Sequence, residues 1–388
     1  MKVVILSTAT AYTGGAIITL MNVLPLLQKS GVEPYFILKG HGQLESVLTE
    51  KGIPYSVIRS YDWCVPEQKT KGLKNFIMWR VKSIINLIAE LKTYLLFKNQ
   101  RADVYHINCI YNGVGVNAAK MLKIPVVWHL REFVDLYGET TVFFNTKRAW
   151  ERINRANKII CVSHYLAQAY EDKIQDKTKL QVVYDGIDMV LFEMRKNMRT
   201  RNENIIIGLA GTAPIKNHRD AILAIKKVYQ TGNSVVLKIV GRWGMGNYER
   251  SYKEELKNLI IENELEDCVE FIGMRNDMNE FWAECDISVV CSKRESFGLA
   301  ATEAMACGVP LICSDTSISG ELTENGKNVL VYRTGDSEEL AGCIQKYIDQ
   351  FGTRELEDKT ERAAAYVRKH FSVELSAKKL GLIYKEVV

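Results

Sequence analysis

Two glutamates, Glu295 and Glu303, frame a short segment whose residue types suit a phosphate and a sugar. The segment follows a β-branched apolar run, passes Gly298, and continues into an alanine-rich stretch. Free N–H groups at the start of a helix bind phosphate, and a glycine lets a ligand approach the backbone. Carboxylates accept hydrogen bonds from sugar hydroxyls. We therefore expect the amides of Phe297, Gly298 and Leu299 to meet a diphosphate, with the two glutamates bordering it.

The elements that must position these residues alternate between strands and helices. The β-branched run Lys2–Ser7 predicts a strand buried on both faces. The pair Gly14–Gly15 then precedes a predicted helix over Ile17–Ser30, and Val32–Leu38 predicts the next strand. This rhythm recurs along the chain, and it is typical of a parallel sheet with crossover helices.

The chain is predicted to hold two such domains. The polar stretch 193–204 indicates an interdomain linker, and a second αβ series starts at Ile205–Leu209. We expect an α/β protein with two facing doubly wound, Rossmann-like domains over 1–190 and 191–372, followed by an amphipathic helix over 373–388. Because ligands bind at the carboxyl ends of parallel strands, facing sheets would form an interdomain cleft suited to group transfer.

Composition narrows the class of protein. The chain has 388 residues, of which 47% are hydrophobic and 25% charged, and these values exclude collagen-like and disordered classes. No apolar run is long enough to span a bilayer, and the first residues predict a strand, not a signal peptide, so we expect an intracellular, cytoplasmic protein. The nine cysteines are scattered without metal-site spacing, which predicts reduced, mostly buried thiols and no metal site.

The segment from Glu295 to Pro310 carries a family resemblance. Its E-x7-E pattern, with F-G, E-A-M-A and G-x-P, resembles the signature of the retaining family-four glycosyltransferases, which have the GT-B fold. Asp185 stands where the family usually has Asn, and Leu322 where it has Ile. The resemblance covers nearly the whole chain and includes the opening strand and the segments 184–188, 269–273 and 321–326.

The resemblance implies a retaining, hexosyltransferase-like transfer from a nucleotide-sugar to an acceptor hydroxyl. Glu303 would bind the ribose, and Glu295 would hold a hydroxyl of the donor sugar. The nucleotide-sugar, by expectation a UDP-sugar, is a co-substrate, so no cofactor is implied. The absence of Asp-x-Asp agrees with metal-independent chemistry. The acceptor is expected to be a glycan or a lipid-linked glycan, in polysaccharide or glycolipid synthesis. The family also implies that the helix at 373–388 returns toward the first domain.

A cation must meet the negative charge that gathers on a departing diphosphate. Lys216 follows a predicted strand and resembles the family's phosphate-binding lysine. The family usually has an arginine where this chain has Thr212, so the second cation is missing from its place. Arg242, after the next strand, is the candidate substitute, with Arg294 as another.

The first domain offers its own polar groups. His129 ends the predicted strand Val126–His129 and resembles the family histidine that reaches the donor sugar, where it would bind a hydroxyl or act as a base. The neighbouring Arg131 and Glu132 offer an ion pair with each other as an alternative to ligand contact. Gly14 and Gly15 would let the backbone approach the diphosphate, or simply form a tight turn. We expect His106 to be structural and Asn108 to be a weaker ligand candidate.

The net charge of +5 is distributed unevenly. The segment 69–101 has eight basic residues and the single acid Glu90, so it carries +7 and the remainder −2. It also contains many large apolar residues, and it predicts one long or two consecutive helices. Such a helix either contacts an anionic membrane surface, as a peripheral protein of the inner face would, or packs on its own sheet with its lysines in water. No motif indicates nucleic-acid binding.

Two other functions remain open. A catalytically silent GT-B binding or scaffold protein would keep the fold, although Glu295, Glu303 and Lys216 are all present. A nucleotide-dependent oxidoreductase would also have parallel-sheet domains, but the dinucleotide fingerprint is missing after the first strand. We therefore expect a glycosyltransferase.

Overall fold

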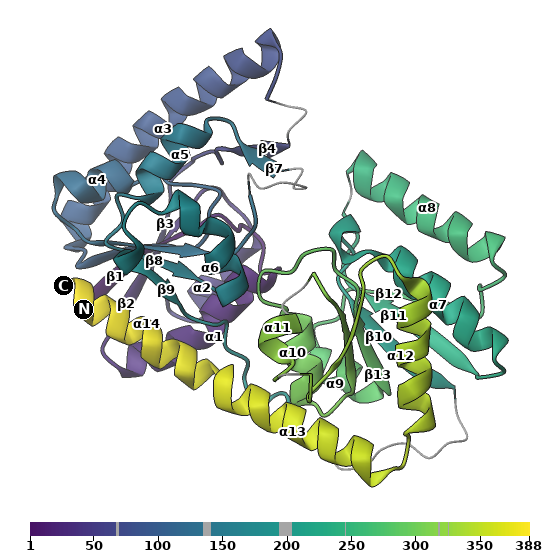
Figure 1. Ribbon diagram of the computed structural model, residues 1–388. Helices are drawn as coiled ribbons and strands as arrows, with labels where there is room; N and C mark the ends of the chain where they lie inside the picture. Colours follow the sequence, from purple (N-terminus) through teal and green to yellow (C-terminus); the bar gives the residue numbers. More distant parts are fainter. Residues whose placement is uncertain (67–69, 135–140, 194–203, 245, 317–318, 325) are drawn as a thin grey trace. The chain divides into compact units, whose positions relative to one another are not determined.

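The computed structural model describes residues 1–66, 70–134, 141–193, 204–244, 246–316, 319–324 and 326–388 (Figure 1). The chain forms two compact units, which are described here one at a time. Unit 1 comprises Met1–Gly186 with Val373–Val388, and unit 2 comprises Ile187–Ser372. The predicted linker at 193–204 lies almost wholly outside the described residues, and the predicted cleft stays a prediction.

Unit 1 is built on a parallel sheet in the order β3-β2-β1-β5-β6-β8-β9. The strands are β1 (Lys2–Ser7), β2 (Glu33–Leu38), β3 (Tyr55–Val57), β5 (Val104–Ile107), β6 (Val126–Leu130), β8 (Lys158–Cys161) and β9 (Leu180–Val182). A separate antiparallel pair joins β4 (Cys64–Pro66) and β7 (Thr141–Phe143). Successive residues of β1 are buried on both faces because helices cover both sides of the sheet.

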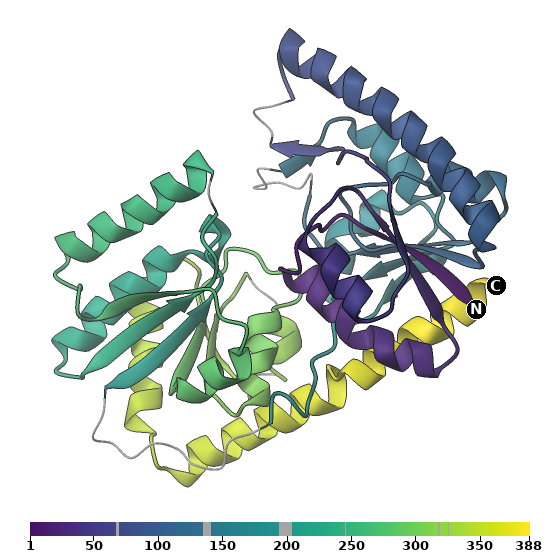
Figure 2. The same cartoon turned by 180° about the vertical axis from the view of Figure 1, so that it is seen from behind.

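The helices of unit 1 include the last helix of the chain. They are α1 (Gly15–Lys29), α2 (Gln43–Glu50), α3 (Leu73–Gln100), α4 (Val116–Met121), α5 (Thr146–Ile153), α6 (His164–Tyr170) and α14 (Val373–Val387). Leu380 and Tyr384 of α14 join the same apolar cluster as Leu24 of α1 and Val3 of β1. Apolar burial therefore fixes the chain's end to its beginning (Figure 2).

Unit 2 has a second parallel sheet, in the order β12-β11-β10-β13-β14-β15. Its strands are β10 (Ile205–Ala210), β11 (Val235–Val240), β12 (Val269–Gly273), β13 (Ile287–Val290), β14 (Leu311–Ser314) and β15 (Leu330–Tyr332). Its helices are α7 (His218–Gln230), α8 (Asn247–Glu262), α9 (Met278–Glu284), α10 (Leu299–Ala306), α11 (Ser319–Leu322), α12 (Ser337–Asp349) and α13 (Arg354–His370). The prediction of two doubly wound, Rossmann-like domains is confirmed.

Each strand order reverses at one place. In unit 1 the strands that follow β1 first extend the sheet on one side, through β2, and later on the other side, from β5 onward. In unit 2 the sheet likewise extends from β10 first through β11 and later, on the other side, from β13 onward. The loops that follow two such neighbouring strands diverge, and the crevice at their carboxyl ends is where open α/β sheets bind ligands. The loops after β10 and β13 carry Lys216 and Glu295.

Several elements were not predicted from the sequence, namely the β4–β7 pair, β9, α11, β15 and α13. The segment predicted as one or two helices at 69–101 is the single helix α3. None of the nine cysteines is part of a disulfide, and Cys64 and Cys343 are half-buried while the others are buried. None of the helices within the described residues combines the length and apolar character of a membrane-spanning segment.

Candidate functional site

The centre of the site in unit 2 is an ion pair between two residues that the sequence singled out. The Nζ atom of Lys216 donates to Oε2 of Glu295 at 2.5 Å. The buried Ser292 hydroxyl donates to the same oxygen at 3.1 Å. Both members of the pair are largely shielded from solvent. The structure thus brings the predicted phosphate-binding cation and the predicted sugar-binding carboxylate into direct contact.

Backbone geometry holds this pair in place. Gly211 has φ +98°, a backbone conformation that favours glycine, and a Cβ atom added there would lie 2.8 Å from Cε of Lys216. The N–H of Lys293 donates to the carbonyl of Ile215 at 2.9 Å, which ties the loop after β13 to the loop after β10. The two charged side chains therefore approach from loops that are themselves joined.

The helix α10 begins beside the ion pair. Gly298 is its N-cap with φ +86°, a conformation that favours glycine, and no side-chain hydrogen bond caps this end. The first helical backbone bond runs from the N–H of Thr302 to the carbonyl of Gly298. A small pocket is lined by Lys216, Glu295, Gly298 and Ala300 together with strand residues of β10 and β13. The predicted phosphate-binding helix end thus lines the same pocket as the cation.

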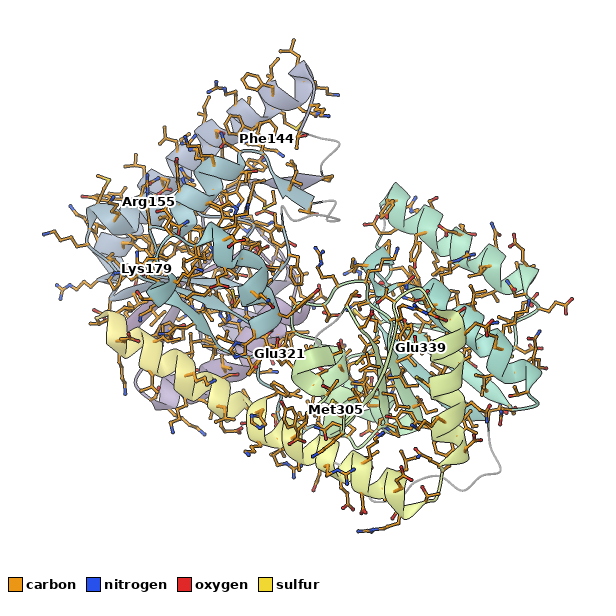
Figure 3. The ribbon with its side chains drawn as sticks, in the orientation of Figure 1. Phe144, Arg155, Lys179, Met305, Glu321 and Glu339 are labelled. Carbon is orange, nitrogen blue, oxygen red and sulfur yellow. The ribbon has the colours of Figure 1, made fainter. Side chains whose placement is uncertain are left out.

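Glu303 lies further along α10 and has a different environment. It is half-buried, and the indole N–H of the buried Trp282 donates to its Oε2 atom at 3.2 Å. Burial raises the pKa of Glu303 to about 7, and the hydrogen bond from Trp282 opposes part of that shift. Its neighbour Met305, labelled in Figure 3, is fully buried and fixes the opposite side of the helix. The predicted ribose-binding carboxylate, with its pKa near neutrality, therefore lies on the helix whose start is the predicted phosphate-binding end.

Thr212, which replaces the family arginine, has a structural contact. Its hydroxyl donates to the carbonyl of Arg242 at 2.7 Å, so the loops after β10 and β11 are held together. The Arg242 side chain is exposed. The backbone of Arg242, the predicted second cation, is therefore held beside the loop that carries Lys216.

In unit 1, His129 lies at the end of β6 and is almost fully buried. Nη2 of Arg131 lies 3.3 Å from Nδ1 of His129. A guanidinium has only donors, so Nδ1 must accept and the proton of the neutral ring resides on Nε2. Burial, then the charge of Arg131 and then His106, lower the pKa of His129 well below its ordinary value. The buried Nε2 atom has no hydrogen-bond partner among the described residues.

Arg131 forms an ion pair with Asp185. It does not pair with Glu132, which was the alternative to ligand contact that the sequence suggested. Its guanidinium donates to the Asp185 carboxylate and also to Thr19 and Asn108, each of these at 2.9 Å. Glu132 instead accepts from the N–H of Ile110 at 3.3 Å, and burial raises its pKa to about 7. The aspartate that replaces the family's usual asparagine therefore neutralises a buried arginine.

His106 and Asn108 are buried in the same region. Nδ1 of His106 lies 2.5 Å from the Tyr384 hydroxyl of α14, and its ring stacks on His129 with centroids 5.5 Å apart. Burial lowers the pKa of His106 to about 3. Asn108 accepts from Arg131 and donates to the carbonyl of Ala16. Both residues position their neighbours.

Gly14 and Gly15 form the start of α1. Gly14 is the N-cap with φ +94°, and no heavy atom lies within 4 Å of the position where a Cβ would stand. Both glycines are exposed, and the first turn of α1 contains no acidic residue. The backbone at this point is therefore open to an approaching ligand.

Sequence reasoning missed a second concave region, also in unit 1. It is lined by residues that follow β1, β2 and β3, by β4 and by one side chain of α3, and it includes Thr10, Lys39, Tyr61, Asp62 and Lys82. Lys39 donates to Oδ2 of Asp62 at 2.5 Å, while the buried Oδ1 atom has no partner among the described residues. No motif marks these residues, because they meet only when β2, β3 and α3 fold together.

Two family models match the two halves of the chain. Residues 13–190 match the model described as Glycosyltransferase Family 4, and residues 191–369 match the model described as Glycosyl transferases group 1. The division between the matched halves falls close to the division between the two units.

Curated relatives share about a quarter of their residues with this chain. N-acetyl-alpha-D-glucosaminyl L-malate synthase of Bacillus anthracis is 28% identical over 246 residues, 61% of each chain. The chain thus spans about three fifths of that relative's length. A putative colanic acid biosynthesis glycosyltransferase of Escherichia coli is 25% identical and covers 72% of this chain and 70% of its own. A putative glycosyltransferase of Bacillus subtilis is 26% identical and covers 98% and 90%.

Solved structures resemble the fold over its full length. Anabaena HepE in complex with UDP superposes with a TM-score of 0.78 at 21% identity and covers 100% of both chains. The same protein with UDP-glucose gives 0.77 at 21% identity, again over 100% of both. A glycosyltransferase from Rickettsia africae gives 0.79 at 18% identity, covering 100% of this chain and 98% of that one. The fold is therefore that of the GT-B glycosyltransferases.

Removing the partner of Arg131 is predicted to destabilise unit 1 strongly. Asp185→Ala leaves a buried guanidinium uncompensated and is expected to cost about 3–5 kcal/mol of unfolding free energy. Asp185→Asn, which keeps an acceptor, is expected to cost less. The Lys158–Glu386 pair, whose glutamate is exposed, provides a control, and Glu386→Ala should cost no more than about 1 kcal/mol. Urea unfolding measures all three; equal losses for Asp185→Ala and Glu386→Ala would contradict the buried pair's importance.

Proposed function

We propose that this chain, a glycosyltransferase whose two halves match Glycosyltransferase Family 4 and Glycosyl transferases group 1, moves a sugar from a nucleotide-sugar to an acceptor hydroxyl with retention of anomeric configuration. The observation that carries the proposal is the meeting of Lys216 and Glu295 beside the uncapped start of α10. The name of the colanic acid biosynthesis relative supports polysaccharide or glycolipid synthesis as the setting.

The donor binds in unit 2. The diphosphate lies on the amides that begin α10, and Lys216 leaves Glu295 to meet a phosphate oxygen. Helix-end amides and a cation fixed before reaction stabilise the charge that develops on the leaving group. The exposed Arg242 supplies a second positive charge for the diphosphate, in place of the arginine that the family usually has at the position of Thr212. The HepE complexes with UDP and UDP-glucose support a uridine diphosphate donor, the choice that the family resemblance also implies.

The two glutamates bind different parts of the donor. Glu303 accepts hydrogen bonds from the ribose hydroxyls. Once Lys216 turns to the phosphate, Glu295 accepts from a hydroxyl of the donor sugar, while Ser292 keeps the carboxylate oriented. The same donor thus gives Lys216 and Glu295 each a new partner in place of the other.

The transfer needs no separate base. The bond between the sugar's anomeric carbon and the phosphate oxygen breaks, and its electron pair leaves with the diphosphate. The acceptor oxygen bonds to the same face of that carbon, and its proton passes to the departing phosphate oxygen. His129 is poorly suited to take this proton, because Arg131 already occupies its acceptor nitrogen. We propose that its Nε2–H donates to a sugar hydroxyl.

The acceptor binds in unit 1, in the concave region lined by Lys39, Tyr61, Asp62 and Lys82. The unpartnered Oδ1 atom of Asp62 is the acceptor for a sugar hydroxyl. The two lysines favour an acceptor that carries a phosphate, because their charge is only partly offset by Asp62.

Methanolysis of nucleotide-sugars tests the proposal. The purified chain is incubated with UDP-, GDP- and ADP-sugars in dilute methanol, and nuclear magnetic resonance identifies the methyl glycoside. One donor class should give a product with the donor's own anomeric configuration. Lys216→Met should slow it at least a hundredfold, and Lys346→Met on α12 should leave it within twofold. An inverted product would exclude retention. No turnover and no thermal stabilisation by any donor would favour a silent GT-B scaffold.

Proton release on donor binding is predicted from Glu303. With a pKa of about 7, its carboxyl is largely protonated at pH 6.5, and ribose hydroxyls that donate to it favour the ionised form. Titration calorimetry in two buffers of different ionisation enthalpy should show proton release with the wild type and none with Glu303→Gln, which should also bind more weakly.

Protein stability supplies the control for this variant. The pKa of Glu303 in the folded protein is raised from its usual 4.5 to about 7. The unfolded chain therefore loses this proton at lower pH than the folded protein does, and the free energy of unfolding falls as the pH rises from about 4.5 to about 7. Glu303→Gln should therefore be more stable than the wild type at pH 8, by up to about 3 kcal/mol. Higher stability with unchanged donor affinity and proton release would mean that Glu303 does not contact the nucleotide.

A fourth prediction concerns acceptor binding. Asp62→Asn keeps the shape of the unit 1 pocket but weakens an acceptor atom, so the KM for the best octyl glycoside of a panel should rise about tenfold. Methanolysis of the donor should stay within twofold of the wild type, because methanol makes no use of the pocket. A change in methanolysis with an unaltered acceptor KM would place Asp62 in donor binding instead.

A further inference from the structure

The helix α3 carries a continuous row of exposed apolar side chains. They recur at intervals of three and four residues, and at about 100° per residue they lie within about 40° of one line along the helix. Leu73 is 75% exposed, Ile84 61% and Leu91 62%. The members of this apolar stripe are Leu73, Ile77, Val81, Ile84, Ile88, Leu91 and Leu95. Exposed patches of this kind mark interaction surfaces.

Basic residues border the apolar stripe on both sides. Lys74 and Lys92 lie about 60° from its centre on one side, and Arg80 and Lys98 lie about 60° from it on the other. All four are exposed. The only acid of the helix, Glu90, is buried and turned inward, where it accepts from the Asn117 side chain at 3.1 Å. The outward surface of α3 is therefore apolar along its centre and positive along both edges.

The way α3 is attached leaves this surface open. Its buried residues all lie in the second half of the helix, and they are Ala89, Glu90, Thr93 and Phe97. Asn86 fixes the middle by exchanging two hydrogen bonds with the backbone of Tyr61. In both ribbon views the first turns of α3 extend beyond the rest of unit 1 (Figures 1 and 2). There Trp79 stacks on Phe144, labelled in Figure 3, which steadies the extended end.

Two kinds of occupant fit an apolar stripe with this spacing. A second copy of the helix would pair in a coiled coil, because the three- and four-residue intervals match a heptad. Both edges are basic, however, so a second copy in either orientation would place like charges opposite each other. An anionic lipid surface meets both requirements, since it accepts the apolar side chains and attracts both rows of cations.

We infer that α3 docks unit 1 on an anionic membrane surface, with the apolar stripe inserted among the lipids and Lys74, Arg80, Lys92 and Lys98 among the headgroups. The helix lies in the plane of the interface, as amphipathic helices with basic edges do. Lys82 is on the other side of the helix, where it lines the pocket of Asp62. Docking through the apolar stripe would therefore leave this pocket uncovered. The docking itself does not depend on the proposed sugar transfer.

Co-sedimentation of the full chain with vesicles tests the docking. The probes are phosphatidylcholine vesicles with and without a quarter of phosphatidylglycerol, at low salt. The wild type should sediment with the anionic vesicles and not with the neutral ones. The double variant Ile84→Gln/Leu91→Gln should bind at least tenfold more weakly, while the matched double variant Ile261→Gln/Leu382→Gln should stay within twofold. Ile261 and Leu382 are 58% and 57% exposed and lie on α8 and α14.

The charged edges are tested separately. Lys74→Gln/Lys92→Gln should weaken binding to anionic vesicles at least fivefold, and 0.5 M salt should weaken the wild type likewise. The affected side chains are exposed, so an unchanged circular dichroism melt verifies the fold. Failure of the wild type to bind anionic vesicles, or equal binding by the stripe variant and its matched control, would overturn the inference. If the wild type is a dimer that does not bind vesicles, and the stripe variant is a monomer, the apolar stripe would instead be the contact with a second copy.

Discussion

The ion pair between Lys216 and Glu295 is the interaction on which the site of unit 2 depends. Two opposite charges that are mostly withdrawn from water require each other, unless a ligand supplies a better partner to each. The pair forms because β10 and β13 are neighbours whose connections diverge, so their loops meet at one end of the sheet. Gly211 and Gly298 then allow the close approach of lysine and helix end. In the proposed function, a diphosphate becomes the new partner of Lys216 and a sugar hydroxyl becomes the new partner of Glu295.

Unit 1 uses the opposite arrangement for its own buried cation. Arg131 is held by Asp185, Thr19 and Asn108, so its charge is already compensated and it has little to offer a phosphate. What it provides is orientation, because its remaining donor fixes which nitrogen of His129 carries the proton. Unit 1 thus contributes a positioned donor and a separate concave region, while the exchangeable charges lie in unit 2.

The sequence predicted the alternation of strands and helices, because buried parallel strands have uninterrupted β-branched runs and their helices have caps and stops. It also predicted where Lys216, Glu295 and Glu303 lie, since a strand, a polar turn and an alanine-rich helix place them at known points of one sheet, while their roles in donor binding stay predictions. It did not predict the Arg131–Asp185 pair, whose members are 54 residues apart and whose contact depends on how the segment after β9 lies beside the end of β6. The Asp62 pocket and the exposure of the apolar stripe were equally out of reach, because they depend on which side of α3 the tertiary fold covers.

The most direct measurement is a crystal structure of the whole chain with a bound nucleoside diphosphate. The account predicts that Nζ of Lys216 lies about 3 Å from a phosphate oxygen, that the amides at the start of α10 donate to the same diphosphate, and that the bond to Glu295 is broken. The ribose hydroxyls should lie against Glu303. A diphosphate bound elsewhere, or at α10 with the Lys216–Glu295 pair intact, would contradict the central claim that the donor takes over this ion pair.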